Sequence, residues 1–294
     1  EKKDQIEIID KSETINKFNN NNSLSDLNNA FTNKSFKIIV KNGYQLVKPL
    51  IIYHITNPDI WSKNINLRLD FELGKDSSLR LIDLYNDTSE KNFLNIFYNF
   101  DLKENAVLKN YKVDKLENKN IKYSFNNIEQ DKNSISETFI LSSGSNFFKN
   151  EINCNLKGEY SSAFVNGILS LNNDKHHEIR TIINHLTENT KSYQLIKSVL
   201  DDNSKSVYQG KIFVNSEAQK TDGYQLSKAI LLNKDSEFNA KPELEIYADD
   251  VKCSHGSASG SLSEDSIFYL MSRGLNYQQS RELLINGFLL EVVE

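Results

Sequence analysis

The sequence predicts a mainly β protein: a parallel β-helix with two strands per coil, a polar and partly helical N-terminal segment, and a short C-terminal helical module. Three observations predict it. Apolar and polar residues alternate with a period of two through most of the 294 residues, as in strands with one buried face. Small residues recur at a fixed interval after polar corners. Helical periodicity appears near the C-terminus.

Residues 1–35 are expected to form the first segment, which is polar and weakly helical. An asparagine run at 19–22 precedes a weakly helical stretch at 23–31. The start Glu-Lys-Lys-Asp-Gln does not resemble a signal peptide, and no apolar run approaches the ~18 residues of a membrane span. Because the chain lacks an initiator Met and ends as another helix is predicted to begin at Phe288, we expect a fragment whose C-terminal module is truncated.

Residues 36–260 are expected to form the β-helix core. Short polar breaks separate its alternating segments, for example 36–40, 65–73, 93–100 and 212–214. The pattern contains no convincing helix, which excludes a doubly wound α/β fold.

A repeat within this core favours stacked coils. Each small residue lies 28 positions beyond the last, at Ser78, Ala106, Ser134, Ser162, Thr190 and Ala218. A fixed offset of this size is typical of a solenoid in which every coil adds two strands. Because Ser, Asn and Ala are common residues, a strand-rich sandwich remains an alternative. A β-helix leaves open edges at its ends, so we expect an end strand to be a docking site for another chain.

Residues 261–294 are expected to form the helical module. Ser263 is a suitable N-cap for a first helix. A second helix is expected from about Asn276, with Gln279 at the capping-box position, to a stop at Asn286-Gly287. The module is acidic and lacks a basic patch, so a DNA-binding helix-turn-helix is disfavoured and a packing or partner-docking role is favoured.

The net charge and the cysteine content narrow the partners and the cellular compartment that we expect for the protein. The formal net charge of −5 argues against nucleic acid or an anionic membrane as the default partner. Cys154 and Cys253 lie far apart, so the sequence suggests no disulfide framework and indicates a reducing compartment.

The candidate metal contacts are Cys253 and His255. Two positions apart in an extended segment, they share one face, so a thiolate and an imidazole would project together. The simpler interpretation is a small buried cysteine beside a hydrogen-bonded histidine. Two ligands do not close a metal site, which for zinc needs four. Further residues or a second chain would have to complete it.

Other candidate sites are weaker. His176, His177 and His185 are possible metal ligands, although the first two follow a polar corner and the third is expected to be structural. Asp249 and Asp250 resemble a catalytic pair, but neighbours in a strand face opposite sides. The sequence has no phosphate-binding glycine loop, nucleophile elbow or zinc-knuckle spacing. We therefore expect no ATP hydrolysis or acyl transfer by the chain itself.

Several motifs resemble, in order, the SufB/SufD family of the SUF iron–sulfur cluster assembly machinery. They are Asn184-His-Leu-Thr-Glu-Asn-Thr190, Val207-Tyr-Gln-Gly-Lys-Ile-Phe-Val214, Ala218-Gln-Lys-Thr-Asp-Gly-Tyr-Gln225, Pro242-Glu-Leu-Glu-Ile-Tyr-Ala-Asp-Asp-Val-Lys-Cys-Ser-His-Gly256 and Phe268-Tyr-Leu-Met-Ser-Arg-Gly274. Fainter matches are Leu27-Asn-Asn-Ala-Phe31 and Val47-Lys-Pro-Leu-Ile51. With two cysteines, and Ser254-His255-Gly256 where the SufB branch carries an acidic Glu-His-Glu, the chain is more similar to the SufD branch.

This resemblance implies a β-helix that pairs with a SufB paralogue through terminal strands and docks the SufC ABC-type ATPase with its C-terminal helices. The nascent Fe–S cluster is expected at the SufB junction, facing Cys253 and His255, with no cofactor in the isolated chain. The chain is then a non-catalytic subunit of the bacterial cytoplasm or a plastid-type organelle. For the chain in isolation, a homodimer is a further alternative. The alternative from another class is a carbohydrate-binding or carbohydrate-active β-helix protein, which calls for aromatic grooves, convergent carboxylates and secretion.

Overall fold

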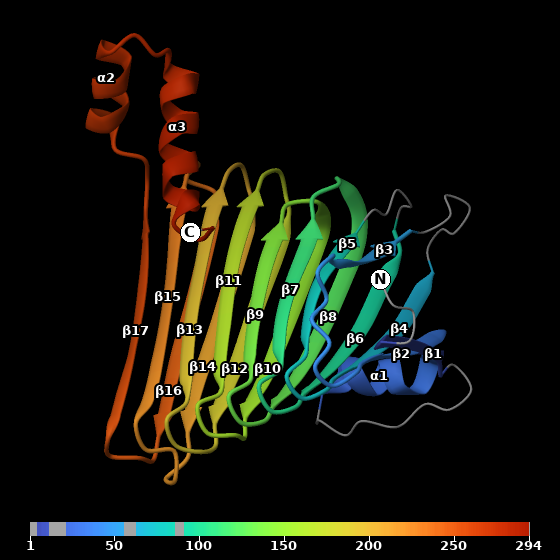
Figure 1. Ribbon diagram of the computed structural model, residues 1–294. Helices are drawn as coiled ribbons and strands as arrows, with labels where there is room; N and C mark the ends of the chain where they lie inside the picture. Colours follow the sequence, from blue (N-terminus) through green and yellow to red (C-terminus); the bar gives the residue numbers. More distant parts are fainter. Residues whose placement is uncertain (1–4, 12–21, 56–62, 86–90, 294) are drawn as a thin grey trace.

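The fold is a parallel β-solenoid with short C-terminal helices, as predicted (Figure 1). A computed structural model describes residues 5–11, 22–55, 63–85 and 91–293. Within these residues the strands form a nine-stranded and an eight-stranded sheet.

Strands alternate between the two sheets along the chain. In order across the nine-stranded sheet, the described strands are β1 (Ile6–Asp10), β2 (Lys34–Val40), β4 (Asn64–Leu73), β6 (Phe93–Leu102), β8 (Asn118–Gln130), β10 (Ser145–Leu156), β12 (His176–His185), β14 (Lys205–Val214) and β16 (Glu237–Ile246). In the eight-stranded sheet they are β3 (Leu50–His54), β5 (Ser78–Tyr85), β7 (Val107–Asp114), β9 (Ile135–Ser142), β11 (Ser162–Leu171), β13 (Lys191–Leu200), β15 (Thr221–Leu231) and β17 (Val251–Gly260).

Each coil stacks on the previous one in parallel register. Phe148 pairs with His177 of the next coil, and His177 pairs with Ser206 of the coil after that. Side chains of one parity therefore meet between the two sheets, where they form a continuous apolar core that includes the stacked pair Phe71 and Phe100. The exception is β1, which pairs antiparallel with β2 and lies in the segment for which the sequence indicated weak helix.

The 28-residue repeat is approximately right, but its register needs a correction. The small residues that stack at this corner are Ser77, Ala106, Ser134, Ser161, Thr190 and Thr221, as the backbone bonds between coils show. Ser78 and Ser162 instead begin strands, and Ala218 precedes the stacked Thr221 by three positions. The interval varies, because extra residues can bulge outward at a corner without disturbing the ladder of strands.

The corners explain why small hydroxyl residues recur. The Ser134 hydroxyl donates to the Asp131 carbonyl, three residues earlier, at 2.6 Å. The same bond is made by Ser77, Ser161, Thr190, Ser204 and Thr221. Asn133 just before Ser134 has a φ of 56°, a left-handed conformation that Asn tolerates better than most residues. Its side chain donates to Asn105 of the preceding coil.

The N-terminal helix covers the outside of the nine-stranded sheet. Helix α1 spans Ser23–Phe31, the stretch that the sequence marked as weakly helical, and Asn22 caps it by accepting from Leu24 and Ser25. The rest of the asparagine run, 19–21, lies outside the described residues. Buried Asn28 fixes the helix to the sheet through bonds to the carbonyls of two strands.

The C-terminal helices form a hairpin that projects beyond the strand ends (Figure 1). Helix α2 spans Glu264–Ser272 with Ser263 as its N-cap, and α3 spans Tyr277–Leu290 with the predicted capping box between Asn276 and Gln279. The predicted stop at Asn286-Gly287 and new helix at Phe288 are wrong, because α3 continues through Gly287. A glycine ends a helix by adopting positive φ, as Gly274 does after α2 and Gly287 does not.

Among the described residues, no helix has the length and apolar content that a bilayer crossing requires.

The coil spacing predicts a sharp difference between two glycines. A Cβ at Gly158 would lie 1.9 Å from the backbone nitrogen of Lys132 in the preceding coil, whereas one at Gly287 meets nothing within 4 Å. We expect Gly158→Ala to destabilise the solenoid by ~2–3 kcal/mol through overpacking. Gly287→Ala is the matched control and should be neutral or stabilising, by at most ~1 kcal/mol. Thermal unfolding followed by circular dichroism measures both, and equal midpoints would contradict the close approach of the coils.

Candidate functional site

The predicted metal contacts lie on a terminal strand. Within the described sheets, β17 ends the eight-stranded sheet beside β15, and β16 ends the nine-stranded sheet beside β14. Both strands lie at the same end of the solenoid (Figure 1). Terminal strands present backbone N–H and C=O groups that no neighbouring strand of the chain satisfies, and such edges template pairing with another chain.

Cys253 is half-buried at this end. It pairs with Gly223 of β15 and packs with Val251 and Leu244 against the last apolar cluster, which includes Ile212. A Cβ on Gly223 would lie 3.4 Å from the Cys253 sulfur, so the glycine leaves space for the sulfur. Burial raises the pKa of the Cys253 thiol, although a hydrogen bond to the Gly223 backbone opposes this shift. The protonated thiol is therefore the resting form, and a metal or a cation must displace its proton.

His255 shares the face of Cys253 but is exposed. It pairs with Gln225 of β15, which is fully buried because β17 covers it. In the described chain no further coil covers β17, so His255 at the equivalent position faces solvent. An inward-facing position of the solenoid thus becomes an accessible imidazole at its end.

The pair does not form a closed metal site. Among the described residues, no group of three or more His, Cys, Asp or Glu side chains could hold a metal ion. Cys253 and His255 could supply two ligands of a site shared with another molecule, in keeping with the expectation from their spacing.

The other candidate histidines are not brought together. His177 points inward, between the Ser142 hydroxyl and the Ser145 carbonyl, at 2.8 and 2.7 Å. His185 also points inward and bonds to the hydroxyls of Thr190 and Ser192. His176 lies on the outer face, where it contacts Glu178 at 3.1 Å.

Asp249 and Asp250 occupy an exposed bend just before β17. The Asp250 backbone N–H donates to the Gln219 side chain, and the Asp250 carbonyl accepts from Lys220. These bonds position the turn that leads into β17.

The helical hairpin is attached to the solenoid through the end of α3. Lys197 of β13 has a buried side chain that donates to the Phe288 carbonyl and to the Glu291 carboxylate. Its ammonium also lies 4.5 Å from the centre of the Phe288 ring. Lys197 in turn holds the pKa of Glu291 below its usual range. Buried Val292 packs nearby against Leu195 and Ile168.

The far part of the hairpin exposes apolar side chains. Phe268 is 73% exposed, and α2 also exposes Tyr269 and Met271 while α3 exposes Tyr277 and Leu283. The apolar side chains of α2 therefore pack little against this chain, apart from buried Ile267. A set of exposed large apolar residues on a projecting element marks an interaction surface.

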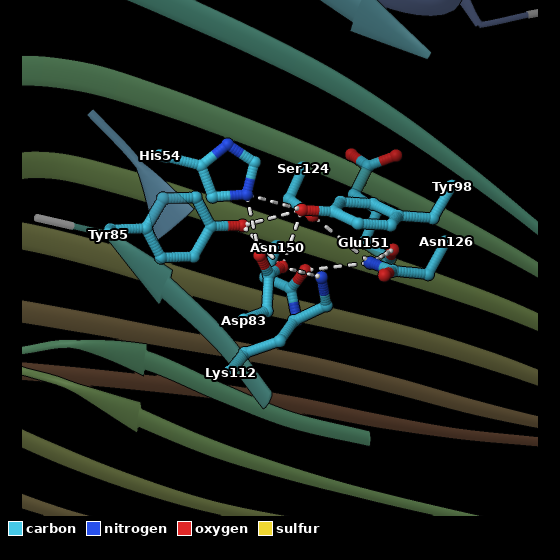
Figure 2. A network of polar contacts seen from close by, with 9 residues as sticks. All are labelled: His54, Asp83, Tyr85, Tyr98, Lys112, Ser124, Asn126, Asn150 and Glu151. Carbon is cyan, nitrogen blue, oxygen red and sulfur yellow. Dashed lines mark hydrogen bonds and ion pairs between the residues drawn. The ribbon is translucent and has the colours of Figure 1, made fainter. Parts of the chain in front are cut away.

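A buried polar network in the first coils was missed by the sequence analysis (Figure 2). Asp83 accepts from Lys112 at 2.9 Å, from Tyr98 at 2.5 Å and from His54 at 2.5 Å. Burial alone would raise the pKa of Asp83, but Lys112 and His54 outweigh it and hold the carboxyl well below its usual range. Burial lowers the pKa of Lys112, and Asp83 opposes the shift.

A sequence signal for this network existed. Asp83 and Lys112 are 29 residues apart, one coil, and both stand at inward positions of their strands, which in β5 are otherwise Leu and Tyr. Opposite charges at equivalent inward positions of adjacent coils predict a buried ion pair. Tyr98 comes from the opposite sheet, so no spacing along the chain identifies it.

The fold and its open end define a class of protein: a β-solenoid whose last described strands, β16 and β17, have no further strand beside them. A family model described as "SUF system FeS cluster assembly, SufBD core domain" matches residues 57–288. The chain therefore belongs to the SufBD family, as the motifs indicated.

Individual relatives agree with this assignment. The iron–sulfur cluster assembly protein SufD of Escherichia coli is 30% identical over 264 residues, which are 87% of this chain and 62% of that protein. The chloroplastic protein ABCI7 of Arabidopsis thaliana is 48% identical over 64 residues, 22% of this chain and 14% of its own. The iron–sulfur cluster assembly protein SufB of Bacillus subtilis is 25% identical over 136 residues, 46% of this chain and 29% of its own. The chain thus spans only part of the length of its relatives.

The buried histidines predict acid sensitivity. Burial lowers the pKa of both His177 and His185 from 6.5 to about 4. The unfolded chain therefore binds more protons between these values, so stability is complete above pH 6.5 and is lost as the pH falls toward 4, by at most ~3 kcal/mol per histidine. His185→Gln should flatten this dependence of the unfolding midpoint relative to the parent chain. Equal slopes for the variant and the parent would contradict the burial effect.

Proposed function

We propose that this chain is a SufD-like scaffold subunit of the SUF iron–sulfur cluster assembly system. The observation that carries the proposal is the position of Cys253 and His255 on a terminal strand, as an incomplete ligand pair at an open edge. Family membership supplies the reaction, and the 30% identity with the Escherichia coli SufD protein favours the SufD branch. In this role the chain binds and orients the nascent cluster, and it does not catalyse a bond-forming step by itself.

The partner at this end is a SufB-type paralogue. A second solenoid would extend the sheets through the free backbone edges of β16 and β17. Such pairing covers His255 and the half-buried Cys253, so that ligands from both chains surround one volume shielded from water. The nascent cluster is the cargo of this junction, where Cys253 ligates as the thiolate and His255 as the neutral imidazole.

The partner of the hairpin is a SufC-type ATPase. Exposed Phe268, Tyr269 and Met271 give α2 an apolar surface suited to a protein groove. The three residues 261–263 join α2 directly to β17, so movement of the hairpin acts on the strand that carries Cys253 and His255. ATP-driven motion would thereby open and close the junction.

Cluster assembly is favoured over carbohydrate binding because the family assignment describes the former and the motifs extend to the terminal strand. The location that goes with the proposal is the bacterial cytoplasm or a plastid-type organelle. In the absence of a paralogue, the same free edges permit a homodimer, which mass measurement with and without the partner distinguishes.

The ligand role predicts loss of assembly without loss of fold. We expect His255→Ala and Cys253→Ser, each in a purified complex with the paralogue and the ATPase, to reduce cluster formation at least tenfold, because each removes a metal contact. Cluster absorbance after reconstitution with iron and sulfide measures it. Both residues lie at the edge of the core, so circular dichroism of the variant chains should match that of the parent.

Two substitutions on the same strand serve as controls. Ser257→Ala alters the same face as His255, and Lys252→Ala alters the opposite face; both should retain cluster formation. Retained assembly by the His255→Ala complex would refute the ligand role, and loss in the Ser257→Ala complex would indicate a general disturbance of the edge.

The docking role of α2 predicts that ATPase binding can be weakened while binding of the paralogue is kept. Phe268→Ser removes an exposed apolar side chain from α2 and should weaken ATPase binding about tenfold or more, as truncation of a buried interface anchor does. Binding of the paralogue should be unchanged, because the hairpin stands apart from the β16 and β17 edges. Gln278→Ala on α3 is the exposed polar control. Calorimetric titration with each partner measures both affinities, and unaltered ATPase binding by Phe268→Ser would exclude α2 as the docking surface.

A further inference from the structure

The interior of the first coils carries charges that packing does not require. Asp83 and Lys112 are buried, as are Asp114 and Lys122, whose ion pair is 2.9 Å long. Apolar residues of similar size often stabilise a core as well as a buried ion pair does. In the described residues around this network, Asn126 Oδ1 and Asn150 Nδ2 also lack hydrogen-bond partners. This part of the core is therefore organised for something other than maximal stability.

A pocket reaches this network from the end of the solenoid opposite β17. It has a volume of about 340 Å³ and lies between β3 and the strands β1, β2 and β4. Its walls are apolar, apart from the hydroxyl of Tyr53 and the ring of His54; the apolar members are Ile8, Phe36, Ile38, Leu50, Ile51, Ile52, Leu67 and Leu69. Small-molecule sites commonly combine such walls with a few fixed polar groups.

The network fixes which proton His54 carries. Lys112 and Tyr98 both donate to Asp83 Oδ2, which keeps the carboxylate an acceptor. His54 Nε2 lies 2.5 Å from Asp83 Oδ1 and must therefore be the protonated ring nitrogen. In the neutral ring this leaves Nδ1 as a hydrogen-bond acceptor, and Figure 2 shows it on the side of the ring away from Asp83. Stacking on Tyr85, 4.7 Å between ring centres, holds the ring in this orientation.

We propose that this pocket binds a small neutral ligand with an apolar body and one O–H or N–H donor, which bonds to Nδ1 of His54. The apolar walls take the body of the ligand. Asp83 positions the imidazole, and Lys112 balances the charge of Asp83, so neither needs to touch the ligand. The site is independent of Cys253 and His255, which lie at the other end of the solenoid.

Phenol and toluene form a matched pair of probes, since they differ by one hydroxyl. A purely apolar pocket prefers toluene, which is the more hydrophobic of the two. We expect phenol to bind the full chain about tenfold more tightly than toluene, as one well-placed hydrogen bond provides. Chemical-shift titration by NMR measures both affinities. Equal affinities, tighter binding of toluene, or no binding of either probe at millimolar concentration would overturn the proposal.

Two variants locate the effect. His54→Phe keeps a ring on β3 and should reverse the preference toward toluene, whereas His176→Phe on the outer face should leave it unchanged. Ile52→Phe adds bulk to the pocket wall beside Asp83, with which Ile52 pairs, and should weaken both probes at least tenfold. The Ile52→Phe result stands even if His54→Phe proves unfolded by circular dichroism. Unchanged phenol binding by Ile52→Phe would place the probe elsewhere and refute the site.

Discussion

Backbone hydrogen bonding between successive coils is the interaction on which the rest of this structure depends. Each interior strand satisfies its N–H and C=O groups on the strands of the coil before and the coil after, in parallel register. The arrangement is repetitive, so it has no internal reason to stop and leaves strands with free edges where it ends. The corners with their small hydroxyl residues maintain the register, because only compact side chains fit where coils approach closely.

The end of the stack turns ordinary core positions into accessible ones. Gln225 and His255 occupy equivalent places in adjacent strands, yet the first is buried and the second exposed. The same holds in part for Gly223 and Cys253. A thiol and an imidazole can thus be displayed without a specialised loop, and a second solenoid that continues the sheets would bury them again.

The helical hairpin is attached to this end of the solenoid at two places. It is joined to β17 at one side by a short connection and fixed to β13 at the other by Lys197 and Val292. A protein bound to the exposed part of α2 would therefore act on this attachment and on the edge strand together. At the opposite end, His54 lies on the short edge strand β3 and joins a buried charge network to an apolar pocket. The two ends of the stack thus present different chemistry.

The sequence by itself determined the class of fold, because period-two alternation and regular polar corners report directly which residues face inward. It also determined the pairing of Cys253 with His255 on one face and the caps of α2 and α3, which depend on neighbours in the chain. Only the tertiary structure decided the register of the corners, since Ser77 and Thr221 are identified by the coils they bond to, and the continuation of α3 past Gly287, since the φ of a glycine depends on its surroundings. The Asp83 network depended on the tertiary structure most, because Tyr98 reaches Asp83 from the facing sheet, a contact that no spacing along the chain encodes.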